Sequence, residues 1–393
     1  MKRVVMKQTR GFLLITGVLL IASVALGSCV RHEVAGEQDT PEETVLTGES
    51  GCIRIVVEDP DTKAGGIVYE RDEKPVKRWA FFIFEHASGY LAYRGIVADN
   101  GVVTKRLRTG EYDMEVMANY PESGPEAVNV SSIYSRADFN DLKVSLGQNT
   151  LGAFVMAGTT EDAEGNRIPL KVVQTEEEDV LEVGIRLKRL VSKVMVTGIT
   201  RRFTNAALGA KPMTLKGVYL TNVYTEARYA SDYAVGELGT SRLLWYNALG
   251  WHKDGSAPAT EGVDVLVGDR SLNRSLAQGE TAELDLALYF YPNPMLPSKD
   301  VPSSEWASTA RCTRLVVWVQ VDGRDYYYPA TLPKEDAYAP IGRNSVFSAH
   351  CTLTGLGSSD EDDWIPSAMD ISFEPVLKKD GEWDEVSQVT EVS

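Results

Sequence analysis

The sequence predicts an all-β protein built as two β-sandwiches with little helix. Three observations indicate this fold class. Apolar and polar residues alternate with a period of two in many short segments, clusters of Gly, Asn, Asp and Pro separate these segments, and helical periodicity is scarce. Many short strands with turns between them are typical of β-sandwiches. No repeat of about 20 to 50 residues occurs, which argues against a propeller or a solenoid.

Individual strands follow from this alternation. In "EYDMEVMANY" we expect Met114 and Val116 to face the core, and Asp113 and Glu115 to face solvent. The same pattern predicts strands in three further segments: "VLEVGIRLK", "AELDLALYF" and "AMDISFEP". Two nearly continuous apolar runs, "WAFFIFE" and "RLVVWVQV", predict central strands that are covered on both faces.

The sequence also predicts one short helix and one domain boundary. "SIYSRADFNDLKVSL", Ser132 to Leu146, is the best candidate for a short helix on a connection between strands. The charge pattern changes in "RLKRLVSK", so we place a domain boundary near Lys188. The expected domains are residues 51–188 and residues 189–393.

The N-terminus predicts export. Four basic residues precede an apolar run from Gly11 to Leu26, which has the length of a secretory signal and is short for a membrane span of about 20 residues. The run ends in "LGSC", which resembles the lipobox of bacterial lipoproteins. That resemblance implies a signal peptide over residues 1–28 and a diacylglycerol on the thiol of Cys29. The alternative is an ordinary signal peptide with an unrelated cysteine.

The charge of the remaining chain argues against nucleic acid as a partner. Residues 1–28 contain four basic and no acidic side chains, which leaves 36 basic against 56 acidic side chains in the rest. An acidic surface repels phosphate, and no basic stripe interleaved with aromatic residues occurs. Residues 29–50 carry six acidic side chains and no aromatic one, which predicts a solvated tether.

The other cysteines do not form a disulfide framework. Cys52, Cys312 and Cys351 contain no CxxC motif, although an export compartment permits disulfides. Two alternatives stay open, namely buried free cysteines or a bridge between Cys312 and Cys351.

No catalytic, cofactor-binding or metal-binding residue can be assigned. The four histidines are too far apart in sequence to suggest a metal pair, and the HExxH, GxSxG and GxxxxGK[ST] motifs are absent from the sequence. We therefore do not expect an enzyme. A ligand-binding surface would use exposed aromatic side chains, for which Trp245, Tyr246 and Trp251 are candidates; the alternative is that they pack a loop onto the second domain.

Three groups of segments together resemble the FimA-type major fimbrillins, the lipoprotein precursors of type V pili in Gram-negative bacteria. The first group is "GCIRIVVEDPDTKAGG", "EKPVKRWAFFIFEHASG" and "LRTGEYDMEVMANY". The second is "VGIRLKRLVSKVMVTGI", and the third is "YYYPATL" with "IGRNSVFSAHCTLTGLGSSDEDDWIPSAMDISFEPV". They occur in the order of that family.

The resemblance implies two transthyretin-like β-sandwiches and assembly by strand exchange. A protease removes the lipidated N-terminal segment together with the first strand, and a neighbouring subunit's C-terminal strand fills the groove. Lys63 and Arg71 are the two candidate processing sites. The C-terminal segment "GEWDEVSQVTEVS" would be the donor tail, although its apolar residues are spaced by three rather than two.

The exchanged strand has the composition that this mechanism needs. Ile53, Ile55 and Val57 lie on one face, and burying each contributes about 1.5 to 3 kcal/mol. Loss of the strand would forfeit a large share of a typical domain stability of about 5 to 15 kcal/mol. The expected partners are other fimbrillin subunits with anchor and tip proteins, a maturation protease, and the outer membrane through the lipid.

The sequence therefore predicts a structural subunit of a surface fimbria that supports adhesion, located at the outer membrane and cell surface. Two alternatives stay open. One is an anchor or tip subunit that keeps its lipid. The other is a surface lipoprotein that binds a glycan or host ligand without polymerising.

Overall fold

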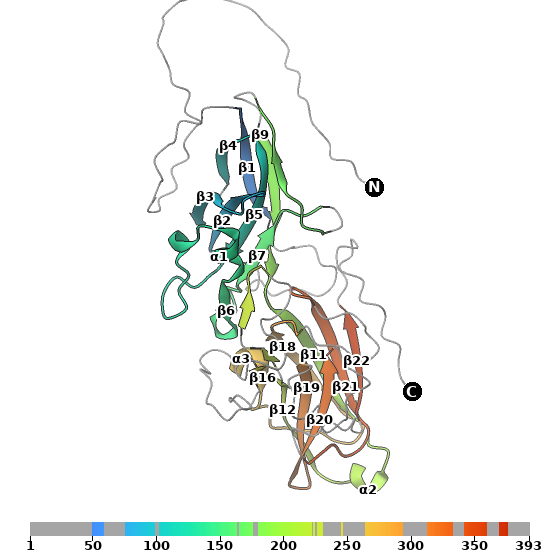
Figure 1. Cartoon of the computed structure of the whole chain (residues 1–393). Coiled ribbons are helices and arrows are strands. Elements are labelled where there is room, and N and C mark those ends of the chain that lie inside the picture. Colours follow the sequence, from blue (N-terminus) through green and yellow to red (C-terminus); the bar gives the residue numbers. More distant parts are fainter. Residues whose placement is uncertain are drawn as a thin grey trace, which may run out of the picture. The chain divides into compact units, whose positions relative to one another are not determined.

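The computed structural model describes residues 49–58, 75–98, 102–162, 165–175, 180–221, 223–224, 226–230, 245–246, 264–293, 313–332, 342–359 and 369–375. These residues form mainly β-strands with a few short helices, so the predicted all-β class is confirmed (Figure 1). No helix among them has the length and apolar character needed to cross a membrane.

Nine of the first ten strands form two sheets, and β6 belongs to neither. One sheet has the order β4-β1-β9, and the other has the order β10-β7-β5-β2-β3 with β8 paired to β5. The strands are β1 (Ser50–Glu58), β2 (Arg78–Glu85), β3 (Leu91–Ala98), β4 (Val103–Arg108), β5 (Gly110–Ala118), β6 (Lys143–Ser145), β7 (Met156–Thr159), β8 (Leu170–Val172), β9 (Val180–Arg186) and β10 (Lys188–Arg189). The helical turns between them are η2 (Val130–Ser132), α1 (Arg136–Asn140) and η3 (Leu146–Gln148).

The later strands form a second pair of sheets, with orders β18-β11-β21-β22 and β16-β12-β19-β20, the latter with β17 on β12. Their bounds are β11 (Ser192–Arg201), β12 (Met213–Thr221), β13 (Val223–Tyr224), β14 (Glu226–Arg228), β15 (Trp245–Tyr246), β16 (Gly268–Asp269), β17 (Arg274–Ser275), β18 (Thr281–Phe290), β19 (Thr313–Val321), β20 (Arg324–Leu332), β21 (Val346–Leu353) and β22 (Met369–Pro375). The helices are α2 (Ala206–Gly209) and α3 (Asp264–Val267). Two small sheets pair β13 with β15 and β14 with β6.

The two pairs of sheets share one topology. The long opening strand of each, β1 or β11, runs antiparallel to one neighbour (β4 or β18) and parallel to the other (β9 or β21). The following strand, β2 or β12, lies beside β5 or β19 in the facing sheet. The second set has one additional strand, β22, on the outer side of β21. The fold thus repeats a sandwich topology that no sequence repeat reveals.

The apolar runs form the core as predicted. Trp79, Phe82 and Ile83 in β2 are fully buried, and β19 is buried along most of its length. The predicted helix exists as α1, which begins at a capping box between Ser135 and Asp138. The helical segment is shorter than the predicted range because the following residues form β6 and η3.

One prediction about β5 is wrong. Asp113 and Glu115 were expected to face solvent, but they are only 4% and 2% exposed. The face of β5 that bears them is covered by charged side chains from α1 and from the segment before β8. A period of two therefore identifies the strand correctly, but it does not say what covers the second face.

A buried polar cluster connects the segment between β6 and β7 to the end of β18. Asn149 donates through Nδ2 to the Tyr291 hydroxyl at 2.8 Å and accepts from the Val155 N–H through Oδ1 at 3.0 Å. The Tyr291 hydroxyl donates in turn to the carbonyl of Ser145 at 3.0 Å. Both Asn149 and Tyr291 are almost completely inaccessible to solvent. The hydrogen bonds of Asn149 to Tyr291 and Val155 are therefore shielded from water.

Replacing Asn149 should therefore destabilise the protein. In Asn149→Ala the Tyr291 hydroxyl and the Val155 N–H lose buried partners, and we expect the free energy of unfolding to fall by about 2 kcal/mol. Urea denaturation followed by fluorescence measures this change. Asn166→Ala is the matched control because Asn166 is exposed. Equal stability of the two variants would contradict the assigned role of the cluster.

Candidate functional site

The first strand is the central strand of its sheet. Residues Ser50–Ile55 of β1 pair antiparallel with β4, and residues Cys52–Glu58 pair parallel with β9 (Figure 1). The sheet contains these three strands only among the described residues. Without β1, β4 and β9 would have no strand between them, and both would lose their backbone partners along this edge.

The inner face of β1 is fully apolar. Ile53 and Ile55 are 0% exposed and Val57 is 9% exposed, so the three residues lie in the core. Arg54, on the opposite face, is exposed. At about 1.5 to 3 kcal/mol for each side chain, burial of the three residues contributes roughly 5 to 9 kcal/mol. This amount is comparable to the total stability of many domains.

The start of β1 is held by residues that follow β8. The N–H of Cys52 donates to the Thr175 hydroxyl at 3.0 Å, and the N–H of Thr175 donates to the carbonyl of Ser50 at 3.3 Å. A Cβ atom at Gly51 would lie 2.1 Å from the carbonyl oxygen of Val173, so only glycine permits this close approach. The chain enters the sheet along a fixed path.

Several predicted site residues lie outside the described residues. These are Cys29 with the signal peptide, the processing candidates Lys63 and Arg71, the donor tail after Pro375, Cys312 and Trp251. Trp245 and Tyr246 form β15, whose backbone pairs with β13. Cys351 carries a free buried thiol, and burial raises its pKa to about 12, so it is unreactive at neutral pH.

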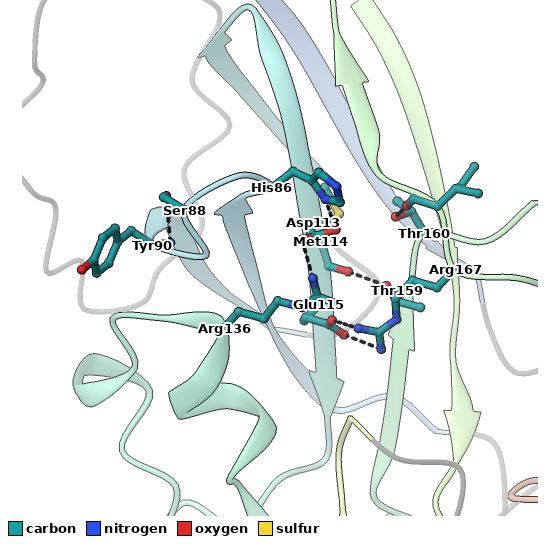
Figure 2. Close-up of polar contacts among 11 residues, drawn as sticks. His86, Ser88, Tyr90, Asp113, Met114, Glu115, Arg136, Thr159, Thr160 and Arg167 are labelled. Carbon is teal, nitrogen blue, oxygen red and sulfur yellow. Dashed lines mark hydrogen bonds and ion pairs between the residues drawn. The ribbon is translucent and has the colours of Figure 1, made fainter.

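A cluster of charged side chains on β5 was not predicted from the sequence. Figure 2 shows the two carboxylates on the covered face of β5 with the side chains that reach them. Asp113 accepts from Arg136 on α1 at 2.7 Å (Nη1 to Oδ2) and contacts His86 at 3.0 Å (Nδ1 to Oδ1). Glu115 forms a two-point ion pair with the guanidinium of Arg167. The only sequence signal was an acidic pair at alternate positions in β5, the strand that pairs with the mainly apolar β2.

Burial determines the ionisation of Glu115. Loss of solvation raises the pKa of this carboxyl from 4.5 to about 7, and the nearby Asp113 adds to the increase. Arg167, Arg136 and Arg343 act in the opposite direction but do not cancel the effect of burial. Near neutral pH this side chain is therefore partly protonated although it contacts a guanidinium.

The arrangement is that of a buried ion-pair network. Asp113 accepts one hydrogen bond from Arg136, and Glu115 is held by both terminal nitrogens of Arg167. Between them, the hydroxyl of Thr159 on β7 donates to the carbonyl of Met114 at 2.8 Å. Among the described residues, no group of three His, Cys, Asp or Glu side chains could hold a metal ion. The network fixes α1 and the segment before β8 onto β5.

The raised pKa of Glu115 predicts a specific pH dependence. The folded chain binds more protons than the unfolded chain between about pH 4.5 and 7, so the free energy of unfolding falls as the pH rises through this window. The contribution amounts to roughly 3 kcal/mol. The difference in unfolding free energy between wild type and Glu115→Gln should change by this amount between pH 5 and pH 8. A constant difference would show that Glu115 has an ordinary pKa.

Comparison with known proteins gives a fold. A scan against protein-family models finds no match, and a search of curated proteins finds none. Among solved structures, the chain is similar to the fimbrilin FimA from Porphyromonas gingivalis, at 10% identity and a TM-score of 0.55, over 83% of this chain and 97% of that one. It is also similar to a candidate cell adhesion protein from Parabacteroides distasonis, at 14% identity and a TM-score of 0.56, over 84% and 96%.

A third similar structure is a candidate cell adhesion protein from Bacteroides eggerthii, at 14% identity and a TM-score of 0.51, over 84% of this chain and 97% of that one. All three structures are named for fimbriae or adhesion rather than for an enzymatic activity. Each is matched over nearly its whole length, so the likeness covers both pairs of sheets rather than one. The chain therefore has the two-sandwich fold of the FimA-type fimbrillins, the family that its sequence motifs resemble.

Proposed function

We propose that this chain is a structural subunit of a surface fimbria that supports adhesion. It is exported as a lipoprotein anchored through Cys29 and polymerises by strand exchange after proteolysis removes the first strand. The observation that carries the proposal is the place of β1, a central strand with three buried apolar side chains at the N-terminal end of the described fold. The shared fold with a fimbrilin supports it.

The physical basis is replacement of one strand by another. Removing β1 would expose an apolar groove lined by β4 and β9, together with the backbone groups that now pair with residues 50–58. Unpaired backbone and exposed apolar surface both favour addition of a strand from another chain. A donor with alternating apolar residues would restore the lost contacts, and each subunit could then complete its neighbour.

The two candidate cleavage sites lie between the first and second strands, where the proposed processing requires them. Lys63 and Arg71 lie between the end of β1 at Glu58 and the start of β2 at Arg78. A cut after either residue would separate β1 and the lipidated tether from the rest of the chain. The proposed donor is the C-terminal segment that follows β22.

Strand exchange is tested with a chain that begins at Asp72. This shortened chain should oligomerise or melt at a lower temperature than a chain that begins at Gly51. Adding the peptide Gly51 to Asp61 should raise its melting temperature by mass action. The peptide with Ile55→Asp should not, because it places a charge in the core, whereas the peptide with Arg54→Asp should, because that position is exposed.

A stable monomer that responds to none of these peptides would refute the mechanism. Equal responses to the Ile55→Asp and Arg54→Asp peptides would also refute it, because binding would then not depend on the buried face. Scanning fluorimetry gives the melting temperatures, and size-exclusion chromatography gives the oligomeric state.

Maturation is tested on the exported protein. A fatty-acid analogue should label the full-length precursor, Cys29→Ala should abolish the label, and Cys52→Ala should keep it because Cys52 is a buried core residue. The chain recovered from purified surface filaments should carry no label and should begin at Ala64 or Asp72. N-terminal sequencing identifies the cut.

The same measurement separates the alternatives. An anchor or tip subunit would be found in filaments with its label and its first strand intact. A surface lipoprotein that binds a glycan or host ligand without polymerising would be labelled and absent from filaments. Label on the Cys29→Ala protein would contradict lipidation at this residue.

A further inference from the structure

The groove that β1 fills is blocked at one end by backbone. Four residues of β1 alternate toward the core, namely Gly51, Ile53, Ile55 and Val57. The last three place buried apolar side chains in the groove. At Gly51, however, a Cβ atom would lie 2.1 Å from the carbonyl oxygen and 3.3 Å from the carbonyl carbon of Val173. These distances leave no room for a side chain, so the innermost face of the groove accepts only glycine at this position.

The carbonyl of Val173 is held in place from both sides. Val173 directly follows β8, which pairs with β5 in the facing sheet. Its neighbour Val172 is 3% exposed, and the Cγ1 atom of Val172 would lie 3.0 Å from the same Cβ atom. On the other side, the N–H of Thr175 donates to the carbonyl of Ser50 at 3.3 Å, and its hydroxyl accepts from the N–H of Cys52 at 3.0 Å. A side chain on β1 would therefore have to displace packed backbone.

The first strand continues past this carbonyl. Ser50 is paired with Arg108 on β4, and the carbonyl of Glu49 accepts from the N–H of Thr109 at 3.0 Å. Glu49 is exposed, so the strand leaves the core at this point. A strand that fills the groove to the same extent as β1 must therefore also pass the carbonyl of Val173.

This contact determines the register of the strand. Side chains alternate along a strand, so a slip of two residues keeps the same side chains on the inner face. In β1 such a slip would bring Ile53 or Glu49 against the carbonyl of Val173, where neither has room. The apolar pattern selects the face that is buried, whereas the contact with Val173 selects one register.

We propose that the carbonyl of Val173 is a register stop for strand exchange. Any strand that replaces β1 in the same direction must carry glycine at the position of Gly51 and apolar residues two, four and six positions later. In strand addition the backbone hydrogen bonds supply affinity, and the pockets for alternate side chains supply specificity. This inference rests on the proposed strand exchange and adds to it the chemistry of the donor strand.

The C-terminal segment meets this requirement only in part. Gly381 is the only glycine in residues 376–393. When Gly381 takes the position of Gly51, Glu385 falls four residues further along the strand. That position belongs to Ile55, which is 0% exposed, and a carboxylate is costly in such a place. A peptide of residues 376–393 should therefore bind the groove more weakly than β1, and its Glu385→Ile variant should bind more tightly than the unchanged peptide.

Melting of the full chain tests the register stop. Gly51→Ala should lower the melting temperature by about 5 °C or more, because the added methyl group overpacks the groove. Gly342→Ala is the matched control, because a Cβ atom at Gly342 would meet no described atom within 4 Å and the φ of Gly342 is not left-handed. This control should leave the melting temperature unchanged. Equal melting temperatures for the two variants would overturn the stop.

Peptides added to a full chain with a weakened first strand test the donor. Ile55→Ala removes buried contacts of β1, so an excess of the peptide of residues 47–61 should replace the chain's own strand and raise the melting temperature. The same peptide with Gly51→Ala should bind about tenfold more weakly or worse. The peptide with Arg54→Ala should bind like the unchanged peptide, because Arg54 is exposed.

The outcomes distinguish the stop from strand exchange itself. No response to the unchanged peptide of residues 47–61 would refute exchange in this groove, and the donor requirement with it. Equal responses to the unchanged and the Gly51→Ala peptide would overturn the glycine requirement and leave exchange standing. If the full chain with Gly51→Ala does not fold, this peptide comparison decides the question.

The peptide of residues 376–393 has its own control. Asp384→Ile changes the residue that would take the exposed position of Arg54, so it should leave the affinity unchanged, whereas Glu385→Ile should increase it. Equal effects of the two substitutions would overturn the register that Gly381 is expected to set.

Discussion

The fold depends on the insertion of one terminal strand between two strands that cannot pair with each other in its absence. The contacts of β1 are non-local; its hydrogen bond to Thr175, for example, spans 123 residues. Some segments at the end of a fold are held only by contacts with residues distant in sequence. An equivalent segment of another chain can replace such a segment, because it restores the same contacts. The contacts that stabilise the first sandwich are therefore the contacts that the proposed strand exchange would have to restore.

The second pair of sheets contains an equivalent strand in a different chain context. β11 occupies the equivalent place, antiparallel to β18 and parallel to β21. It follows β10 after only two residues, and its own first residues are buried, with Ser192 and Lys193 at 1% and 5% exposure. A cut before β11 would have to occur within packed structure, whereas β1 has no sheet strand before it in the described chain. The two equivalent strands thus differ in chain context, and only β1 is a candidate for exchange under the proposed mechanism.

Much of this fold could be predicted from the sequence, because strands with a fixed period and apolar central strands such as β2 are local signals. The short helix α1 was also predictable, since the Ser135 and Asp138 capping box is local. The ion-pair network was not. Whether Asp113 and Glu115 face solvent depends on Arg136 and Arg167, which are distant in sequence and are brought to β5 only by the completed fold. Alternation indicates two different faces, but it cannot indicate what covers them.

The buried ion-pair network of β5 depends on donors that come from other parts of the chain. Placing two carboxylates in the interior next to β2 is costly unless donors accompany them, and the fold supplies arginines from several elements. A guanidinium has five donors, and a carboxylate takes two of them in a fork. An arginine that neutralises a buried acid therefore keeps donors that can bind other acceptors. Burial also keeps Glu115 partly protonated near neutral pH, so the strength of its ion pair with Arg167 depends on pH.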